Sequence, residues 1–224
     1  MDINSPAYND NRNYDYSEVH SEHREEYAVI LSMIEPRKKI IDLGCGNGSL
    51  LELIKQKKEP LKLAGVEISE SGVNAVRAKG IDAIKGSIDQ TLHYTDNEFD
   101  YAICNVTIQM VNYPETLVTE MKRISKYLII SFPNFGFYKN RLDLLLHGRM
   151  PKPLLYGYKW FSTGHIHQLS IVDFYELLHE CRNLDVIKLD TVSSITGIKR
   201  NIVFAYPNLF MPLPVFLIQK KDNT

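Results

Sequence analysis

The sequence predicts an α/β protein with a Rossmann-like, doubly wound and mostly parallel sheet that carries helices on both faces. Apolar runs of strand length alternate with helical segments between residues 39 and 132, which is typical of right-handed βαβ units. A glycine-rich turn, Gly44-Cys-Gly-Asn-Gly48, joins the first of these strands to the first helix. An acid, Glu67, ends the second strand at 19 residues beyond Gly48. This spacing favours a ligand site at the carboxyl edge of a doubly wound sheet.

The elements follow one another in a regular order. A helical pattern over 17–33 ends before Pro36 and precedes the sheet. The expected strands are 39–43, 61–68, 83–85, 99–104 and 127–132, and the helices between them are 49–56, 71–79 and 114–124. At 224 residues the chain is long enough for one elaborated domain with a substantial core.

The pattern changes after Pro133. Residues 134–165 hold aromatics, glycines and prolines around one helix at 138–147, and are too long for a simple connection. A helix at 171–181 and a strand near 184–189 follow. The apolar stretch 202–218 is broken by prolines, and we expect paired strands at its two ends. The parallel sheet should therefore finish with an antiparallel C-terminal strand pair.

Composition narrows the classes of function. Lys and Arg number 26 against 27 Asp and Glu, so no basic field attracts nucleic acid. The longest apolar runs are too short to span a membrane, so no membrane association is expected. The three cysteines are widely spaced and lack a C-x-x-C pattern, which indicates reduced thiols and a cytoplasmic protein.

The residue before the glycine turn indicates which ligand the turn holds. Asp42 would repel the pyrophosphate of a dinucleotide. Glycines at 44, 46 and 48 also fail to give G-x-G-x-x-G, because Ser49 stands where Gly or Ala is needed. A cationic ligand without phosphate suits the carboxylate, and we expect S-adenosylmethionine, with S-adenosylhomocysteine as the product. A turn with incidental glycines is the weaker interpretation.

Further residues at the strand ends extend the predicted cofactor site. Glu67 can accept hydrogen bonds from both ribose hydroxyls. Ser87 and the backbone N–H of Ile88 are candidates for adenine contacts, while Asp89 is either a third such contact or a cap or turn residue. The predicted cofactor contacts are Asp42, Gly44, Cys45, Gly46, Gly48, Glu67, Ile68, Ser87, Ile88, Asp89 and Asn105. For Cys45, a role as a small buried residue is the alternative.

These motifs resemble known families. Asp42-Leu-Gly-Cys-Gly-Asn-Gly48 with Glu67 resembles the class I S-adenosylmethionine-dependent methyltransferases. Other segments between about residues 30 and 220 resemble the MetW family of methionine biosynthesis proteins: Ser131-Phe-Pro-Asn-Phe-Gly136, 141–151, Ile166-His167, Ile171-Val-Asp-Phe174 and Asn208-Leu-Phe210. This resemblance implies the class I methyltransferase fold and a link to homoserine acylation, as a companion of the acyltransferase.

Two features depart from the MetW pattern. His165 stands where Asn is expected, and an N-terminal extension of nearly thirty residues precedes the similarity. The extension carries Tyr8, Tyr14, Tyr16, His20 and His23 and resembles the lid helix of small-molecule methyltransferases. Residues 1–224 are thus expected to form a single domain, with 1–34 as a lid and 134–165 as an insertion over the acceptor side.

The function predicted is methyl transfer to oxygen or nitrogen of a small-molecule acceptor. His165 and His167 are candidate bases and Tyr16 a candidate positioning group, although each histidine could instead be structural. No third ligand accompanies the two histidines, so no metal is expected. The alternative is a MetW-like, cofactor-binding partner of homoserine O-acyltransferase with little or no methyltransferase activity. A nucleic-acid methyltransferase is disfavoured, because Asn105-Val106-Thr107 lacks the Asn/Asp-Pro-Pro-aromatic motif.

Overall fold

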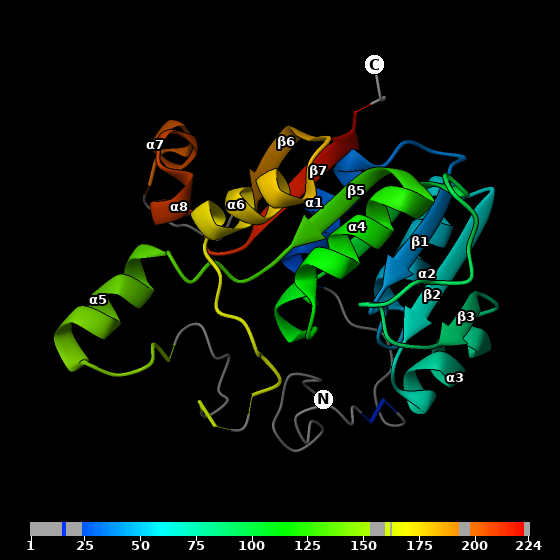
Figure 1. The fold of residues 1–224 in the computed structure, drawn as a ribbon, viewed down its shortest axis with the longest axis horizontal. Helices are drawn as coiled ribbons and strands as arrows, with labels where there is room; N and C mark the ends of the chain where they lie inside the picture. The colour runs from blue at the N-terminus through cyan, green and yellow to red at the C-terminus, as the bar shows by residue number, and fades with distance from the viewer. Residues whose placement is uncertain (1–14, 17–23, 153–159, 162, 193–197, 222–224) are drawn as a thin grey trace.

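A seven-stranded sheet in the order β3-β2-β1-β4-β5-β7-β6 forms the centre of the molecule (Figure 1). The structure is a computed structural model that describes residues 15–16, 24–152, 160–161, 163–192 and 198–221. The strands are β1 (Lys39–Leu43), β2 (Lys62–Glu67), β3 (Asp82–Lys85), β4 (Phe99–Asn105), β5 (Ser125–Ser131), β6 (Leu184–Thr191) and β7 (Pro214–Lys220).

Strand pairing confirms the predicted fold class. β1 to β5 pair in parallel, and β7 runs antiparallel to both β5 and β6. The strand order reverses direction between β1 and β4, which is where ligands bind in open α/β sheets. Asp42 lies at this point, in register with Gly65 of β2 and Ile103 of β4.

Helices cover both faces of the sheet (Figure 1). α4 (Pro114–Ile124) and α6 (Ile171–Cys181) pack on one face together with Ile41. α1 (Glu25–Met33) and α2 (Ser49–Lys58) pack on the other face together with Ile40. α3 (Glu70–Ala78) covers β2 and β3. None of the helices in the described ranges is long and apolar enough to cross a membrane.

α5 (Tyr138–His147) stands away from the sheet (Figure 1). Asn140 is its one buried residue. Four of its leucines are exposed: Leu142, Leu144, Leu145 and Leu146. Residues 153–159 and 162, which belong to the predicted insertion 134–165, lie outside the described residues.

One predicted strand is wrong. Residues at the start of 202–218 form the helices α7 (Arg200–Ala205) and α8 (Pro207–Phe210). The β-branched Ile202 and Val203 favour a strand locally, but β6 already occupies the outer side of β7. Val203 alone is buried in α7, a one-sided pattern that suits a short surface helix. The helix predicted over 17–33 begins at Glu25, and residues 17–23 lie outside the described part.

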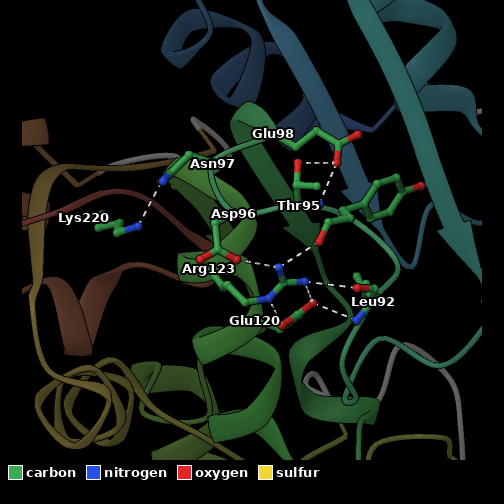
Figure 2. Close-up of polar contacts among 9 residues, drawn as sticks. Leu92, Thr95, Asp96, Asn97, Glu98, Glu120, Arg123 and Lys220 are labelled. Atoms are coloured by element: carbon green, nitrogen blue, oxygen red, sulfur yellow. Dashed lines mark hydrogen bonds and ion pairs between the residues drawn. The ribbon is translucent and has the colours of Figure 1, made fainter.

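Arg123 of α4 fixes the helix-free connection between β3 and β4 (Figure 2). Its guanidinium donates to both carboxylate oxygens of Glu120 at 2.6 and 2.9 Å and to Asp96 at 2.8 Å. It also donates to the carbonyl oxygens of Leu92 and Tyr94. Glu120 is buried and accepts the backbone N–H of Leu92 at 2.7 Å. Hydrogen bonds from the charged side chains of both Arg123 and Glu120 therefore hold this connection to α4.

Replacing Arg123 with Leu should lower the free energy of unfolding by about 2–3 kcal/mol. The change leaves the buried carboxylate of Glu120 and two backbone carbonyl oxygens without their donor. The loss of stability is smaller than for a fully buried ion pair, because Arg123 is partly exposed. Urea denaturation measures the change. Lys221→Leu, which breaks the exposed pair with Asp185, should shift the value by less than about 1 kcal/mol. Equal effects of the two variants would contradict this role for Arg123.

Candidate functional site

The glycine turn is packed between the ends of β2 and β4. Gly44, Gly46 and Gly48 all have positive φ, at 81°, 56° and 75°. The backbone N–H groups of Gly44 and Cys45 donate to the carbonyl oxygen of Val66. A Cβ on Gly44 would lie 2.6 Å from Cγ2 of Thr107. Glycine at 44 is therefore required both by the left-handed backbone and by the close approach of Thr107.

Glu67 locks this turn to the end of β2. Its Oε2 accepts the backbone N–H of Gly46 at 2.9 Å, and its Oε1 accepts the backbone N–H of Ser69 at 2.9 Å. Burial raises the pKa of Glu67, while hydrogen bonds from the backbone of Ser69, Gly46 and Ile68 act in the opposite direction. Each carboxylate oxygen keeps a lone pair for a further donor.

Asp42 is a buried acid beside the glycine turn, and one of its carboxylate oxygens lacks a hydrogen-bond partner. It is 2% exposed at the end of β1, and its Oδ1 is buried without a hydrogen-bond partner. Burial, and secondarily the charge of Glu67, raises the pKa of Asp42 to about 7. Because buried polar atoms are nearly always paired, an unpaired carboxylate oxygen indicates a place prepared for a ligand.

Tyr16 lies against the glycine turn. Its backbone N–H donates to Oγ of Ser71 at 3.0 Å. A Cβ on Gly46 would lie 3.2 Å from its hydroxyl oxygen, and one on Gly72 would lie 3.1 Å from its ring. The side chain is buried. Tyr16 thus joins the predicted cofactor residues around Glu67, while Tyr8, Tyr14, His20 and His23 lie outside the described residues.

The predicted adenine contacts lie in the loop after β3. Asp89 accepts hydrogen bonds from Oγ of Ser87 and from the backbone N–H groups of Asn112 and Tyr113. Burial acts to raise the pKa of Asp89, but these hydrogen bonds keep it below its ordinary value. The carboxylate therefore joins two loops, in keeping with the alternative of a turn residue. Ile88 is buried in the core, and Ile68, beyond Glu67, is 51% exposed.

Asn105 belongs to a polar chain at the end of β4. Its Nδ2 donates to the buried Glu26 of α1 at 3.2 Å, and its Oδ1 accepts from Oγ of Ser131 at 2.5 Å. Val106 follows with φ of 53°, which is strained for a β-branched residue. Its N–H donates to both oxygens of Ser131 at 3.1 Å. Such strain, worth about 1–3 kcal/mol, collects at functional sites.

The histidine segment lies beside the residues after β4. The backbone N–H groups of Ile166 and His167 donate to the carbonyl oxygen of Gln109 at 2.8 and 3.0 Å. Gln109 and His167 each have a buried side-chain atom without a partner, Oε1 and Nε2 respectively. Burial lowers the pKa of His165, so its imidazole is neutral at neutral pH. In the described ranges, no three His, Cys, Asp or Glu side chains are arranged to hold a metal ion.

Cys45 packs into the core. A Cβ on Gly65 would lie 2.6 Å from its Sγ, and its neighbours include Leu51 and Val73. Burial raises the pKa of its thiol well above the ordinary value. Both observations suit the alternative of a small buried residue, while its backbone remains part of the turn.

Segments that resemble MetW are joined to one another by hydrogen bonds. Nδ2 of Asn134 donates to the carbonyl oxygens of Asn208 and Met211, and Oδ1 of Asn208 accepts the backbone N–H of Ile171. A Cβ on Gly136 would lie 2.5 Å from Oδ1 of Asn208. These residues therefore tie the end of β5 to α6 and α8, which is a structural role.

Sequence reasoning missed two site residues. Glu26 sits in a helical pattern, where acids are usually solvated, and only the fold brings it to Asn105. Gln109 gives no signal in the sequence, because a lone Gln in a loop has no characteristic spacing to other residues.

Comparison with known proteins identifies the family of this chain. The family model of the methionine biosynthesis protein MetW matches residues 24–218. The bifunctional methionine biosynthesis protein MetXA/MetW of Rhodopirellula baltica is 35% identical over 66% of this chain and 25% of its own length. A trans-aconitate 2-methyltransferase of Mycolicibacterium gilvum is 30% identical over 45% of this chain and 40% of its own length. The chain thus spans less than half of either relative.

Solved structures share the fold. An S-adenosylmethionine-dependent methyltransferase of Mesorhizobium loti has a TM-score of 0.61 at 15% identity, over 88% of this chain and 98% of its own. The [4+2]-cyclase SpnF also scores 0.61, at 14% identity over 91% and 87% of the two chains. The architecture is therefore the class I methyltransferase fold, and by its sequence this chain belongs to the MetW family.

Proposed function

We propose that this protein binds S-adenosylmethionine and transfers its methyl group to a small-molecule acceptor. The observation that carries the proposal is the buried, unpartnered Oδ1 of Asp42 beside the glycine turn. A carboxylate in this position favours a cation and disfavours a phosphate. The name of the Mycolicibacterium gilvum relative describes methyl transfer to a small molecule, which supports the acceptor class.

The surrounding residues fit this cofactor. The oxygens of Glu67 accept the backbone N–H groups of Gly46 and Ser69. Each oxygen keeps a lone pair that can accept a ribose hydroxyl. The three glycines let the backbone approach a ligand closely. Tyr16 covers the turn and so can shield a bound nucleoside from water.

When bound, S-adenosylmethionine supplies an activated methyl group on a sulfonium. The residues of the chain hold the cofactor in place and exclude water, and alignment of this kind can lower a barrier by about 7–11 kcal/mol. His165 is neutral at neutral pH because burial lowers its pKa, so it can take the proton released by a hydroxyl or ammonium acceptor. Tyr16 packs against the glycine turn and covers the bound cofactor, and it takes no part in the transfer of the proton.

Asp42→Ala and Glu67→Ala should each weaken S-adenosylmethionine binding by about 10- to 100-fold, the usual effect of losing a hydrogen bond to a charged group. Isothermal titration calorimetry measures the affinity. Asp100→Ala is the matched control, because Asp100 accepts the backbone N–H of Lys39 at the opposite edge of the sheet. Absence of binding to the unaltered protein would refute the proposal. Equal losses of affinity in all three variants would show that Asp42 and Glu67 do not contact the cofactor.

The stability of the ligand-free protein should fall as the pH rises from about 5 to about 8. With the pKa of Asp42 raised from 3.8 to about 7, the folded state holds a proton that the unfolded chain releases above about pH 4. This stabilisation is complete below the unfolded pKa and is lost as the pH passes through the folded one. Glu67 acts in the same direction, since its pKa is also raised.

Urea denaturation across this pH range measures the effect, and Asp42→Asn should flatten the pH dependence. The thiols of Cys45 and Cys104 face the same carboxylate, but burial raises the pKa of each, so they stay protonated throughout. Identical pH profiles for the variant and the unaltered protein would show that Asp42 is not the titrating group.

A second candidate function is partnership with the homoserine O-acyltransferase of methionine biosynthesis, with little or no methyl transfer. The specific observation is the Rhodopirellula baltica relative, whose name joins MetXA and MetW in one bifunctional chain. The exposed leucines of α5, up to 78% exposed at Leu145, offer an apolar surface that such a partner could cover.

Leu145→Asp with Leu146→Asp should abolish co-purification with that acyltransferase without weakening cofactor binding. Charges placed in the centre of a docking surface stay unpaired when the surface is covered. Leu61→Asp is the control, because Leu61 is similarly exposed at 64% but precedes β2, far along the chain from α5. Unchanged co-purification of the double variant would exclude α5 as the contact.

A further inference from the structure

α5 carries an apolar stripe on its exposed side. Leu142, Leu145 and Leu146 are 48%, 78% and 72% exposed, and their i, i+3, i+4 spacing puts them on one face of the helix. Asn140, the one buried residue of α5, comes two residues before Leu142 and so lies on the opposite face. The leucine stripe is therefore the side of α5 turned away from its attachment, and the helix itself projects from the sheet (Figure 1).

The attachment of α5 keeps the helix formed and in place. Nδ2 of Asn140 donates to the carbonyl oxygen of Asn134 at 3.1 Å. The ring of Tyr138 packs on that of Phe210 in α8, with the centroids 5.9 Å apart. Gly148, at φ of 59°, ends the helix in the left-handed conformation. A helix that is already formed and anchored loses little conformational entropy when a partner covers it.

Basic residues surround the leucine stripe. The exposed Lys and Arg residues of this segment are Lys139, Arg141, Arg149 and Lys152. Asp143 is the only acid between residues 137 and 152, and its carboxylate already accepts the backbone N–H of Lys152 and pairs with His147. Lys139 and Arg141 are two residues apart on the helix and so flank the stripe on opposite sides. The stripe thus has a positive rim on both sides.

This charge pattern favours one kind of occupant. A second copy of the chain would bring the same basic rim against the first, and like charges across an interface are unfavourable. A helix that lies on a membrane needs a broad apolar face, whereas this stripe is narrow and has a cation on each side. A protein groove that takes a helix by anchors at i, i+3 and i+4 fits the stripe, and acids on its rim fit the cations.

We propose that α5 enters an apolar groove with an acidic rim on a partner protein. Leu142, Leu145 and Leu146 fill the groove, while Lys139 and Arg141 face carboxylates on its two sides. The inference rests on the second proposed function, because the partner to be tested is the homoserine O-acyltransferase. It deepens that function by assigning the binding mode and the sign of the charge that the partner presents.

Binding kinetics test the leucine anchors. Association of the full chain with the purified homoserine O-acyltransferase of the same organism is followed by biolayer interferometry. Leu145→Ala with Leu146→Ala should raise the dissociation rate about 10-fold or more, because the truncated anchors bury less apolar surface. Leu144→Ala is the matched control on the same helix, since Leu144 comes four residues after Asn140 and so lies on the attached side. It should change the dissociation rate by less than about threefold.

Charge and salt test the rim. Lys139→Glu should slow association about 10-fold at low ionic strength, and the difference should largely disappear at about 0.5 M salt. The variant retains the helix, because an acid in the first turn interacts favourably with the helix dipole. Lys57→Glu, at an exposed position of α2, is the control and should leave the association rate within about twofold.

Four results would overturn the inference. Equal effects of Leu144→Ala and the double variant would show that the leucines support α5 and do not contact the partner. Equal slowing by Lys57→Glu and Lys139→Glu would show a general charge effect. Binding to phosphatidylglycerol vesicles, or dimerisation in sedimentation equilibrium, that the double variant abolishes would assign the stripe to lipid or to a second copy. If the unaltered chain does not bind the acyltransferase at either salt concentration, the second proposed function fails, and this inference fails with it.

Discussion

The hydrogen bond from the Gly46 backbone to the carboxylate of Glu67 sets the shape of the site. It closes the glycine turn onto the end of β2, and the N–H groups of Gly44 and Cys45 on the carbonyl of Val66 close it a second time. The turn then holds Asp42 out of water between β2 and β4. Burial raises the pKa of both acids, and the charge of Glu67 adds to the rise at Asp42. A cationic ligand favours the charged forms of these acids and a phosphate disfavours them.

Much of the fold could be predicted, and the glycine turn and its two acids could be singled out, because their signals are local. The alternation of strands and helices, the glycine spacing and the acid after β2 all lie within short stretches of sequence. α7 was mispredicted because Ile202 and Val203 carry a strand propensity that only the occupied edge of β7 overrides. Gln109 and Glu26 were missed because their roles depend on segments distant in the sequence: Gln109 on 166–167 and Glu26 on β4.

Residues from the segments that resemble MetW hold parts of the chain together and do not line the glycine turn. Asn134 and Asn208 join β5, α6 and α8 through side-chain to backbone hydrogen bonds, and Gly136 is glycine because Asn208 is so close. Buried amides with several backbone partners tolerate few substitutes, since each lost bond strands a carbonyl or N–H. A resemblance carried by these residues therefore says little about the chemistry of the protein. The chemistry depends on the strand ends, which unrelated activities share.

The class I methyltransferase fold is compatible with both proposed functions, methyl transfer and partnership with an acyltransferase. SpnF, whose name describes a cyclase, has the same architecture at a similar TM-score to a methyltransferase, so architecture alone does not establish methyl transfer. The glycine turn follows the end of β1, whereas α5 projects away from the sheet (Figure 1). β5 runs from beside β4 into the segment that carries α5, and Ser131 at its end holds strained Val106. The end of β5 therefore connects the residues beside the glycine turn with the segment that carries α5.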